Sequence, residues 1–127
     1  MIIERLREAE AERMATAGVW TWLLQRVSAA LLVVLVLGHF WLLHYAVVGE
    51  KITFDRVLGR LQSGSFFFVL DVALLAVVIF HGFNGIRTVI VDFGIGQRAR
   101  VVLSLVLAAL GAITFLYGMI ALLAFFK

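Results

Sequence analysis

Three long apolar segments, each bounded by charged residues, dominate the pattern of hydrophobic and polar positions along this chain. No Asp, Glu, Lys or Arg occurs in residues 27–49, 72–86 or 101–126. About 20 predominantly apolar residues in a helix suffice to cross the ~30 Å hydrocarbon core of a bilayer. The pattern therefore predicts an all-α membrane protein whose three transmembrane helices cover about 20–48, 66–92 and 101–126.

Polar segments before and between these stretches predict the rest of the architecture. Residues 1–19 mix acidic and basic side chains with a short apolar stripe, which predicts a cytoplasmic amphipathic lead-in rather than a signal peptide. Residues 49–65 place apolar side chains at helical spacing and predict a short helix on the membrane surface. Residues 93–100 predict a tight basic turn. The transmembrane domain is therefore expected to comprise residues 20–127.

The basic residues predict how the helices are oriented. Three spans divide them between two sides of the membrane: Arg5, Arg7, Arg13, Arg26, Arg87, Arg98 and Arg100 on the N-terminal side, and Lys51, Arg56, Arg60 and Lys127 on the other. Because cytoplasmic loops carry an excess of Lys and Arg, this division predicts an N-terminus inside and a C-terminus outside.

The composition agrees with a membrane protein and excludes several kinds of site. The chain is 64% hydrophobic with a mean hydropathy of +1.09, and it contains no proline that would interrupt a long helix. It has no cysteine, which excludes disulfides, thiolate metal sites and iron–sulfur clusters held by this chain. Its net charge of +3 is locally balanced, so a nucleic-acid partner is not expected.

Histidines inside the apolar segments are the candidate functional groups, because ionisable side chains are costly in lipid and are usually functional there. His39 and His81 fall within the predicted hydrocarbon layer, whereas His44 falls near the outer end of the first helix. Neutral imidazole is a good ligand for haem iron, and a helix bundle suits the apolar body of haem. A zinc site would need several clustered ligands. The alternative is an imidazole that is satisfied by a Ser, Thr or carbonyl group of a neighbouring helix.

Polar residues near these histidines extend the candidate site. One face of the second predicted helix carries His81, Asn84, Gly85, Thr88 and Asp92. This face offers an imidazole, a missing side chain one turn further on and a charged end, which are features that a haem would use. Haem propionates need cations near water, and Arg26 and Arg87 are positioned for that role. Asp71 is expected to lie on the outer side and to pair with Arg60.

Two motifs resemble a known family. The segment 81–94, HGFNGIRTVIVDFG, resembles the His-x-x-x-Gly-Ile/Leu-Arg-x-x-x-x-Asp-aromatic motif in membrane-anchor subunits of succinate dehydrogenase, respiratory complex II. The segment 22–29, WLLQRVSA, is similar to the Q-R-x-S/T-A/G signature at the start of the first helix in that family. The segment 38–44, GHFWLLH, resembles the first helix of several bacterial anchors. The resemblance covers roughly residues 20–126.

The resemblance implies a non-catalytic subunit, of the cytochrome b or hydrophobic anchor type, in a bacterial plasma membrane. Such a subunit binds one or two haems b with a second transmembrane anchor, docks the flavoprotein and iron–sulfur subunits at the cytoplasmic face, and helps to form the quinone site. His81 matches the axial haem ligand, and His39 matches the first-helix ligand of two-haem anchors, with His44 as the fallback. The haem-propionate or quinone-site residues implied are Arg26, Ser28, Arg87 and Asp92.

Alternatives remain open at this stage. The chain mixes two anchor types, because Phe93 replaces the tyrosine of one type and Trp22 replaces the serine usual in the other. The pattern is nearest to the hydrophobic anchor subunit. A fumarate reductase anchor, a haem-free structural anchor and a small proton-coupled transporter are the other candidates. The third predicted helix offers only Ser104, Thr114 and Tyr117 to a proton path, which counts against a transporter.

Overall fold

The computed structural model describes the backbone of residues 1–44, 49 and 51–126, and the side chains of these residues except 13–17, 43 and 44. The helices are α1 (Ile2–His44), α2 (Phe54–Gln62), α3 (Ser65–Asp92) and α4 (Gln97–Phe126), and no strand occurs over this part of the chain. Each of the three long helices contains a stretch that is apolar enough to cross a membrane: Gly18–Leu42, Ser65–Asp92 and Gln97–Phe126. The predicted all-α membrane fold with three spans is therefore confirmed.

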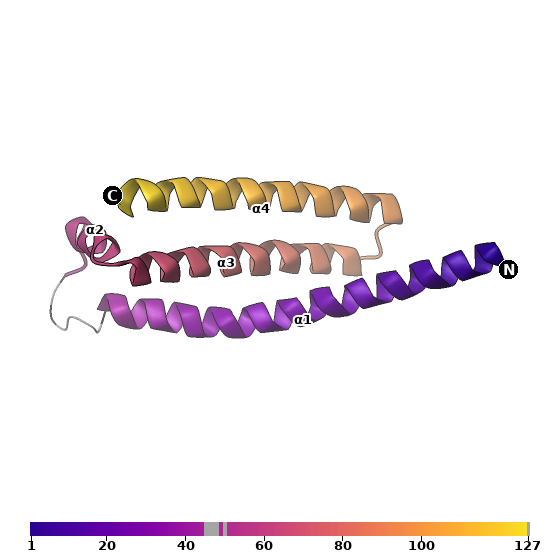
Figure 1. Cartoon of the computed structure of the whole chain (residues 1–127), viewed down its shortest axis with the longest axis horizontal. Helices are drawn as coiled ribbons and strands as arrows, with labels where there is room; N and C mark the ends of the chain where they lie inside the picture. Colours follow the sequence, from indigo (N-terminus) through magenta and orange to yellow (C-terminus); the bar gives the residue numbers. More distant parts are fainter. Residues whose placement is uncertain (45–48, 50, 127) are drawn as a thin grey trace.

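The three long helices lie side by side in one layer, with α3 between α1 and α4 (Figure 1). Consecutive long helices run antiparallel, so the chain termini lie at opposite ends of the layer (Figure 1). In the described part of the chain α3 packs against both neighbours, whereas α1 and α4 do not contact each other. We call the end that carries α2 and the end of α4 the α2 end, and the end that carries residues 93–96 the turn end.

Helix α1 is continuous through the segment that was expected to form a separate lead-in. Its 43 residues correspond to a length of about 65 Å at 1.5 Å per residue, which is about twice the hydrocarbon thickness. The N-terminal part therefore extends beyond the apolar stretch at the turn end (Figure 1). No proline interrupts this part, and a single glycine such as Gly18 costs a helix only about 1 kcal/mol. The other end of the predicted first helix, residues 45–48, lies outside the described residues.

The short connections are close to their predicted positions. Helix α2 lies within the segment 49–65 that predicted an amphipathic surface helix, and its Leu61 is buried. The turn between α3 and α4 contains Gly94 at a φ of +78°, a conformation that a residue with a Cβ rarely adopts. Helix α4 begins four residues earlier than predicted, because Gln97–Arg100 form its first turn and are not part of the loop.

The layer has almost no core of its own. Among the described residues only Ser28, Leu61 and Gly111 are buried, and large apolar side chains are exposed along all three long helices. The helices meet through small residues instead: a Cβ added to Gly118 would lie 2.6 Å from Leu75, and one added to Gly111 would lie 3.4 Å from Phe83. Such contacts are typical of helices that associate in lipid, where exposed apolar surface faces acyl chains or another subunit.

Candidate functional site

The side chain of His81 lies in the interface between α1 and α3, where two polar residues of α1 contact it. Its Nδ1 is 3.0 Å from Oγ of Ser28 and 3.3 Å from Nε2 of Gln25. The Ser28 hydroxyl donates to the backbone carbonyl of Gln25 at 3.0 Å, and Ser28 is only 5% exposed. Because this bond uses the hydroxyl proton, the Ser28 oxygen can accept from Nδ1–H of His81. In that tautomer the imidazole lone pair lies on Nε2, which has no hydrogen-bond partner in the described part of the chain, and the Gln25 amide contacts Nδ1 without donating to it.

Gln25 connects α1 to three residues of α3. Its Nε2 donates to the backbone carbonyl of His81 at 3.1 Å, and its Oε1 accepts from Nδ2 of Asn84 at 2.7 Å. A Cβ on Gly85 would lie 3.1 Å from Nε2 of Gln25, so the amide occupies the space that a side chain at position 85 would take. His81, Asn84 and Gly85 therefore share one face of α3, as their spacing predicted, and Gln25 packs on that face. The polar contacts hold the His81 ring in one orientation.

Most of the remaining predicted residues line a cavity of about 410 Å³ between α1 and α3 at the turn end. Its lining comprises Gly18, Thr21, Trp22, Gln25, Arg26, Arg87, Thr88, Val91 and Asp92. The guanidinium of Arg26 lies 5.4 Å from the centre of the Trp22 ring, in cation–π contact. Arg26, Arg87 and Asp92 thus surround one cavity, whereas Ser28 contacts His81 and does not line it. The cavity combines two cations and one carboxylate with apolar walls.

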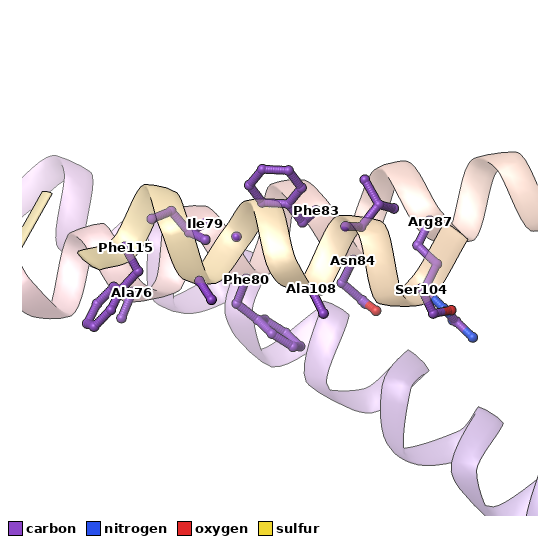
Figure 2. Close-up of a pocket in the computed structure, with 12 residues that line it drawn as sticks. Ala76, Ile79, Phe80, Phe83, Asn84, Arg87, Ser104, Ala108 and Phe115 are labelled. Atoms are coloured by element: carbon purple, nitrogen blue, oxygen red, sulfur yellow. The ribbon is translucent and has the colours of Figure 1, made fainter. Parts of the chain in front are cut away.

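Arg87 also reaches the other side of α3. Its Nε donates to Oγ of Ser104 on α4 at 2.7 Å, and that hydroxyl donates in turn to the carbonyl of Arg100. Both residues lie at one end of an apolar groove of about 380 Å³ between α3 and α4, and Ala76 and Phe115 lie at the other end (Figure 2). Ser104 therefore fixes the position of Arg87, a role that the sequence did not assign to the third span.

His39 lies in the same α1–α3 interface, but nearer the α2 end. Its Nδ1 is 3.1 Å from Oδ1 of Asp71, and the two side chains are 35% and 28% exposed. The predicted partnership of Asp71 with Arg60 is therefore wrong, because Asp71 faces His39 across the interface. The side chain of His44, the fallback ligand, lies outside the described side chains.

The two histidines occupy different depths of the layer. Ser28 marks the level of His81 on α1, and His39 follows it eleven residues later in the same helix. At 1.5 Å per residue, this separation is about 16 Å along the helix axis. One iron atom cannot bind both imidazoles at that separation, so His39 and His81 cannot be the two ligands of one haem within this chain.

Sequence reasoning missed the partners that orient the predicted residues. The sequence did not predict that Gln25, Asp71 and Ser104 each bond to a predicted site residue. For Gln25 a signal was present, because it belongs to the Q-R signature of the first helix. For Asp71 and Ser104 the partner lies on another helix, and a helix that is apolar on all sides does not reveal which face meets its neighbour.

Comparisons with known proteins show which family the chain belongs to. Residues 5–123 match the sequence model of the succinate dehydrogenase/fumarate reductase transmembrane subunit. The succinate dehydrogenase hydrophobic membrane anchor subunit of Halobacterium salinarum is 34% identical over 85 residues, which are 67% of this chain and 65% of that protein, so the match spans just under two thirds of its length. The protein of the same name from Archaeoglobus fulgidus is 30% identical over 98 residues, 77% of this chain and 82% of that protein.

The Mycobacterium tuberculosis succinate dehydrogenase 2 membrane subunit SdhC is 29% identical over 76 residues, 60% of this chain and 54% of that protein. The family match covers well over half of the chain, and the three apolar helices agree with a membrane-anchor role. The chain therefore belongs to the family of succinate dehydrogenase/fumarate reductase transmembrane subunits, as a multi-pass protein of the respiratory membrane.

Proposed function

We propose that this anchor subunit serves a succinate:quinone oxidoreductase, binds haem b through Nε2 of His81 and contributes residues to the quinone site. The observation that carries the proposal is the environment of His81. Ser28 can accept from Nδ1–H, and in that tautomer the Nε2 lone pair is available inside a membrane span. Histidines that bind metals usually donate their other ring N–H to a protein group in this way.

The residues present fit a haem at this position. Ser28 bonds the ring, and Gln25, which accepts from Asn84, bonds the backbone carbonyl of His81. Arg26 and Arg87 lie toward the turn end, where they would bind propionates. When bound, haem b supplies one-electron redox chemistry whose potential depends on axial ligation and burial. The protein contributes the orientation of the ligand, the apolar surroundings and the positive charge.

The cavity at the turn end supports a quinone site. Quinone carbonyls accept hydrogen bonds, and the guanidinium groups of Arg26 and Arg87 are donors within the cavity lining. Asp92 lines the same cavity at the exposed end of α3, where it can exchange protons with water. Phe93, which is 82% exposed, has no group that donates to a quinone carbonyl. This chain therefore supplies cations and one carboxylate, and a sister anchor supplies the rest of the site.

The same arrangement supports an orientation and a set of partners. With the turn end inside, the projecting part of α1 and the arginines near the α3–α4 turn face the cytoplasm, where flavoprotein and iron–sulfur subunits would dock. A single layer of helices leaves apolar surface uncovered, which a second transmembrane anchor would pack against. His39, with Nδ1 engaged by Asp71, is the second proposed haem ligand. A bacterial source stays a prediction.

The chief rival is an anchor of the same family that holds no haem, with Ser28 satisfying a purely structural histidine. A reduced-minus-oxidised absorption spectrum of the purified complex discriminates between them. We expect a bis-histidine haem band in the wild-type complex, loss of at least one haem in His81→Gln, and full retention in the matched variant His44→Gln. Haem content is measured independently as the pyridine haemochrome. A wild-type complex that reduces quinone without any haem band would exclude the proposal.

A further inference from the structure

Ionisable side chains from three different helices converge on a small cavity at the α2 end. His39 of α1, Arg60 of α2 and Asp71 of α3 line it together with apolar residues that include Leu61 and Phe67. Its volume is about 110 Å³, well below the ~300–1,000 Å³ of a pocket that holds a whole organic ligand. The cavity is therefore suited to a small polar group or to one arm of a larger molecule.

The guanidinium of Arg60 lacks an acceptor. Its Nη1 is buried and has no hydrogen-bond partner in the described part of the chain, and the group lies 5.8 Å from the centre of the Phe67 ring. Asp71, the carboxylate in the same cavity, is engaged with Nδ1 of His39. A buried cationic donor is costly unless an acceptor, and preferably an anion, is bound to it. The cavity is thus built to receive an anionic acceptor beside His39.

We infer that Arg60 binds a propionate carboxylate of a haem whose iron is held by Nε2 of His39, and that Asp71 is a positioning residue for this histidine. The inference rests on the proposed haem-binding function and extends it to two residues outside the turn-end site. The cavity receives only the carboxylate arm, in agreement with its size. The inference also assigns a function to α2, which carries Arg60 and is held against the long helices by its buried Leu61.

The two residues have opposite effects on the haem at His39. A carboxylate that accepts from Nδ1–H makes the imidazole a stronger donor to iron and adds negative charge, and both effects stabilise the ferric state. Neutralising Asp71 therefore raises the midpoint potential. The positive charge of Arg60 beside a propionate stabilises the ferrous state, so its removal lowers the potential. His81 is about 16 Å from His39 along the helix axis and does not line the cavity of Arg60 and Asp71, so these variants should shift a haem at His81 much less than one at His39.

The test is a redox titration of the whole purified complex, with haem quantified as the pyridine haemochrome. We compare Asp71→Asn, Arg60→Gln and the control Lys51→Gln, which removes one positive charge from an exposed residue on the same side of the membrane. We expect two haems per complex, loss of one in His39→Ala, an upward shift of that component in Asp71→Asn, a downward shift in Arg60→Gln and no shift in the control. If Arg60→Gln loses this haem altogether, Arg60→Lys should restore it.

Shifts of the same sign, no shift in either variant, or a failure of Arg60→Lys to restore a lost haem would overturn the inference. A wild-type complex with one haem that depends on His81 and not on His39 would also overturn it, while leaving the proposed function intact. A wild-type complex without any haem would instead refute the proposed function. The two failures are therefore distinguishable in one set of spectra.

Discussion

Replacing Ser28 by Ala removes the group that holds Nδ1 of His81 and leaves the backbone geometry of α1 unchanged. In the wild-type chain the Ser28 oxygen is 3.0 Å from Nδ1, and the residue is 5% exposed, so water has little access to replace the lost oxygen. Leaving a buried donor without its acceptor costs about 1–3 kcal/mol. We therefore expect the alanine variant to bind haem at His81 more weakly while the helices remain assembled.

The magnitude can be worked out in two ways that agree. Each 1.4 kcal/mol corresponds to a tenfold change in an equilibrium constant, so a loss of about 1–3 kcal/mol weakens binding by roughly 5- to 150-fold. Removal of a group that orients a metal-binding histidine typically costs about 10- to 100-fold in affinity. Gln25 keeps its bond to the His81 backbone carbonyl and still holds this part of α3 against α1, so the loss should fall in the lower part of this range.

The assay is the transfer of haem from the purified complex to excess apomyoglobin, followed by its absorption spectrum. We expect transfer from the His81 site to be about 10-fold faster in Ser28→Ala than in the wild-type complex. Thr114→Ala is the matched control, because it also removes a hydroxyl. In the described part of the chain, that hydroxyl bonds only to the backbone carbonyl of Leu110 in its own helix. Equal transfer rates in Ser28→Ala and Thr114→Ala would show that Ser28 does not orient the ligand.

Three further changes test separate parts of the structure. Gly85→Ala should displace the amide of Gln25, because the new Cβ would lie 3.1 Å from its Nε2, and we expect a weaker haem band. Gly82→Ala, whose new Cβ would have nothing within 4 Å, should keep the wild-type band. Gly118→Val should lower the melting temperature of the complex in detergent, because a Cβ there would lie 2.6 Å from Leu75 and such overpacking costs about 1–3 kcal/mol. A melting temperature equal to that of Gly82→Ala would contradict the packing of α4 against α3. Arg87→Gln should slow quinone reduction at least 10-fold, by loss of a charged hydrogen bond worth about 1.5–3 kcal/mol, and should leave succinate oxidation by an artificial soluble acceptor unchanged. Quinone kinetics like those of the wild type would remove Arg87 from the site.

The spans could be predicted because length and the absence of charge are local properties of the chain. The second span was placed at 66–92 and is found as Ser65–Asp92. The start of α1 could not be placed in the same way. The sequence becomes apolar near residue 20, but helical hydrogen bonds do not require apolar side chains, so α1 continues unbroken from Ile2.

The candidate site could also be predicted in part: its residues could be chosen from the sequence, but their contacts could not. His81, Ser28 and Arg87 were chosen from their residue types and motifs, but 53 residues separate His81 from Ser28, and nothing in either segment fixes the register of one helix against the other. The space at Gly85 was expected to suit a flat ring, and the structure fills it with the amide of Gln25. The register of two helices depends on which small residues allow them to approach closely, and this depends on both helices together.

The distribution of polar groups indicates which side of this chain a sister anchor must approach. The contact of His81 with Ser28, the contact of His39 with Asp71 and the turn-end cavity all lie between α1 and α3. In the described part of the chain, Ser104 is the only side chain of α4 that bonds to a predicted site residue. A haem ligand is useful only where a large cofactor can reach it, and such a cofactor also needs a second wall. Under the proposed function, a sister anchor would supply that wall across the α1–α3 interface, because the long helices of this chain form a single layer. The packing of α4 through glycines against α3 then serves to hold α3 in register with α1, which keeps His81 of α3 aligned with Ser28 of α1, and Asp71 of α3 aligned with His39 of α1.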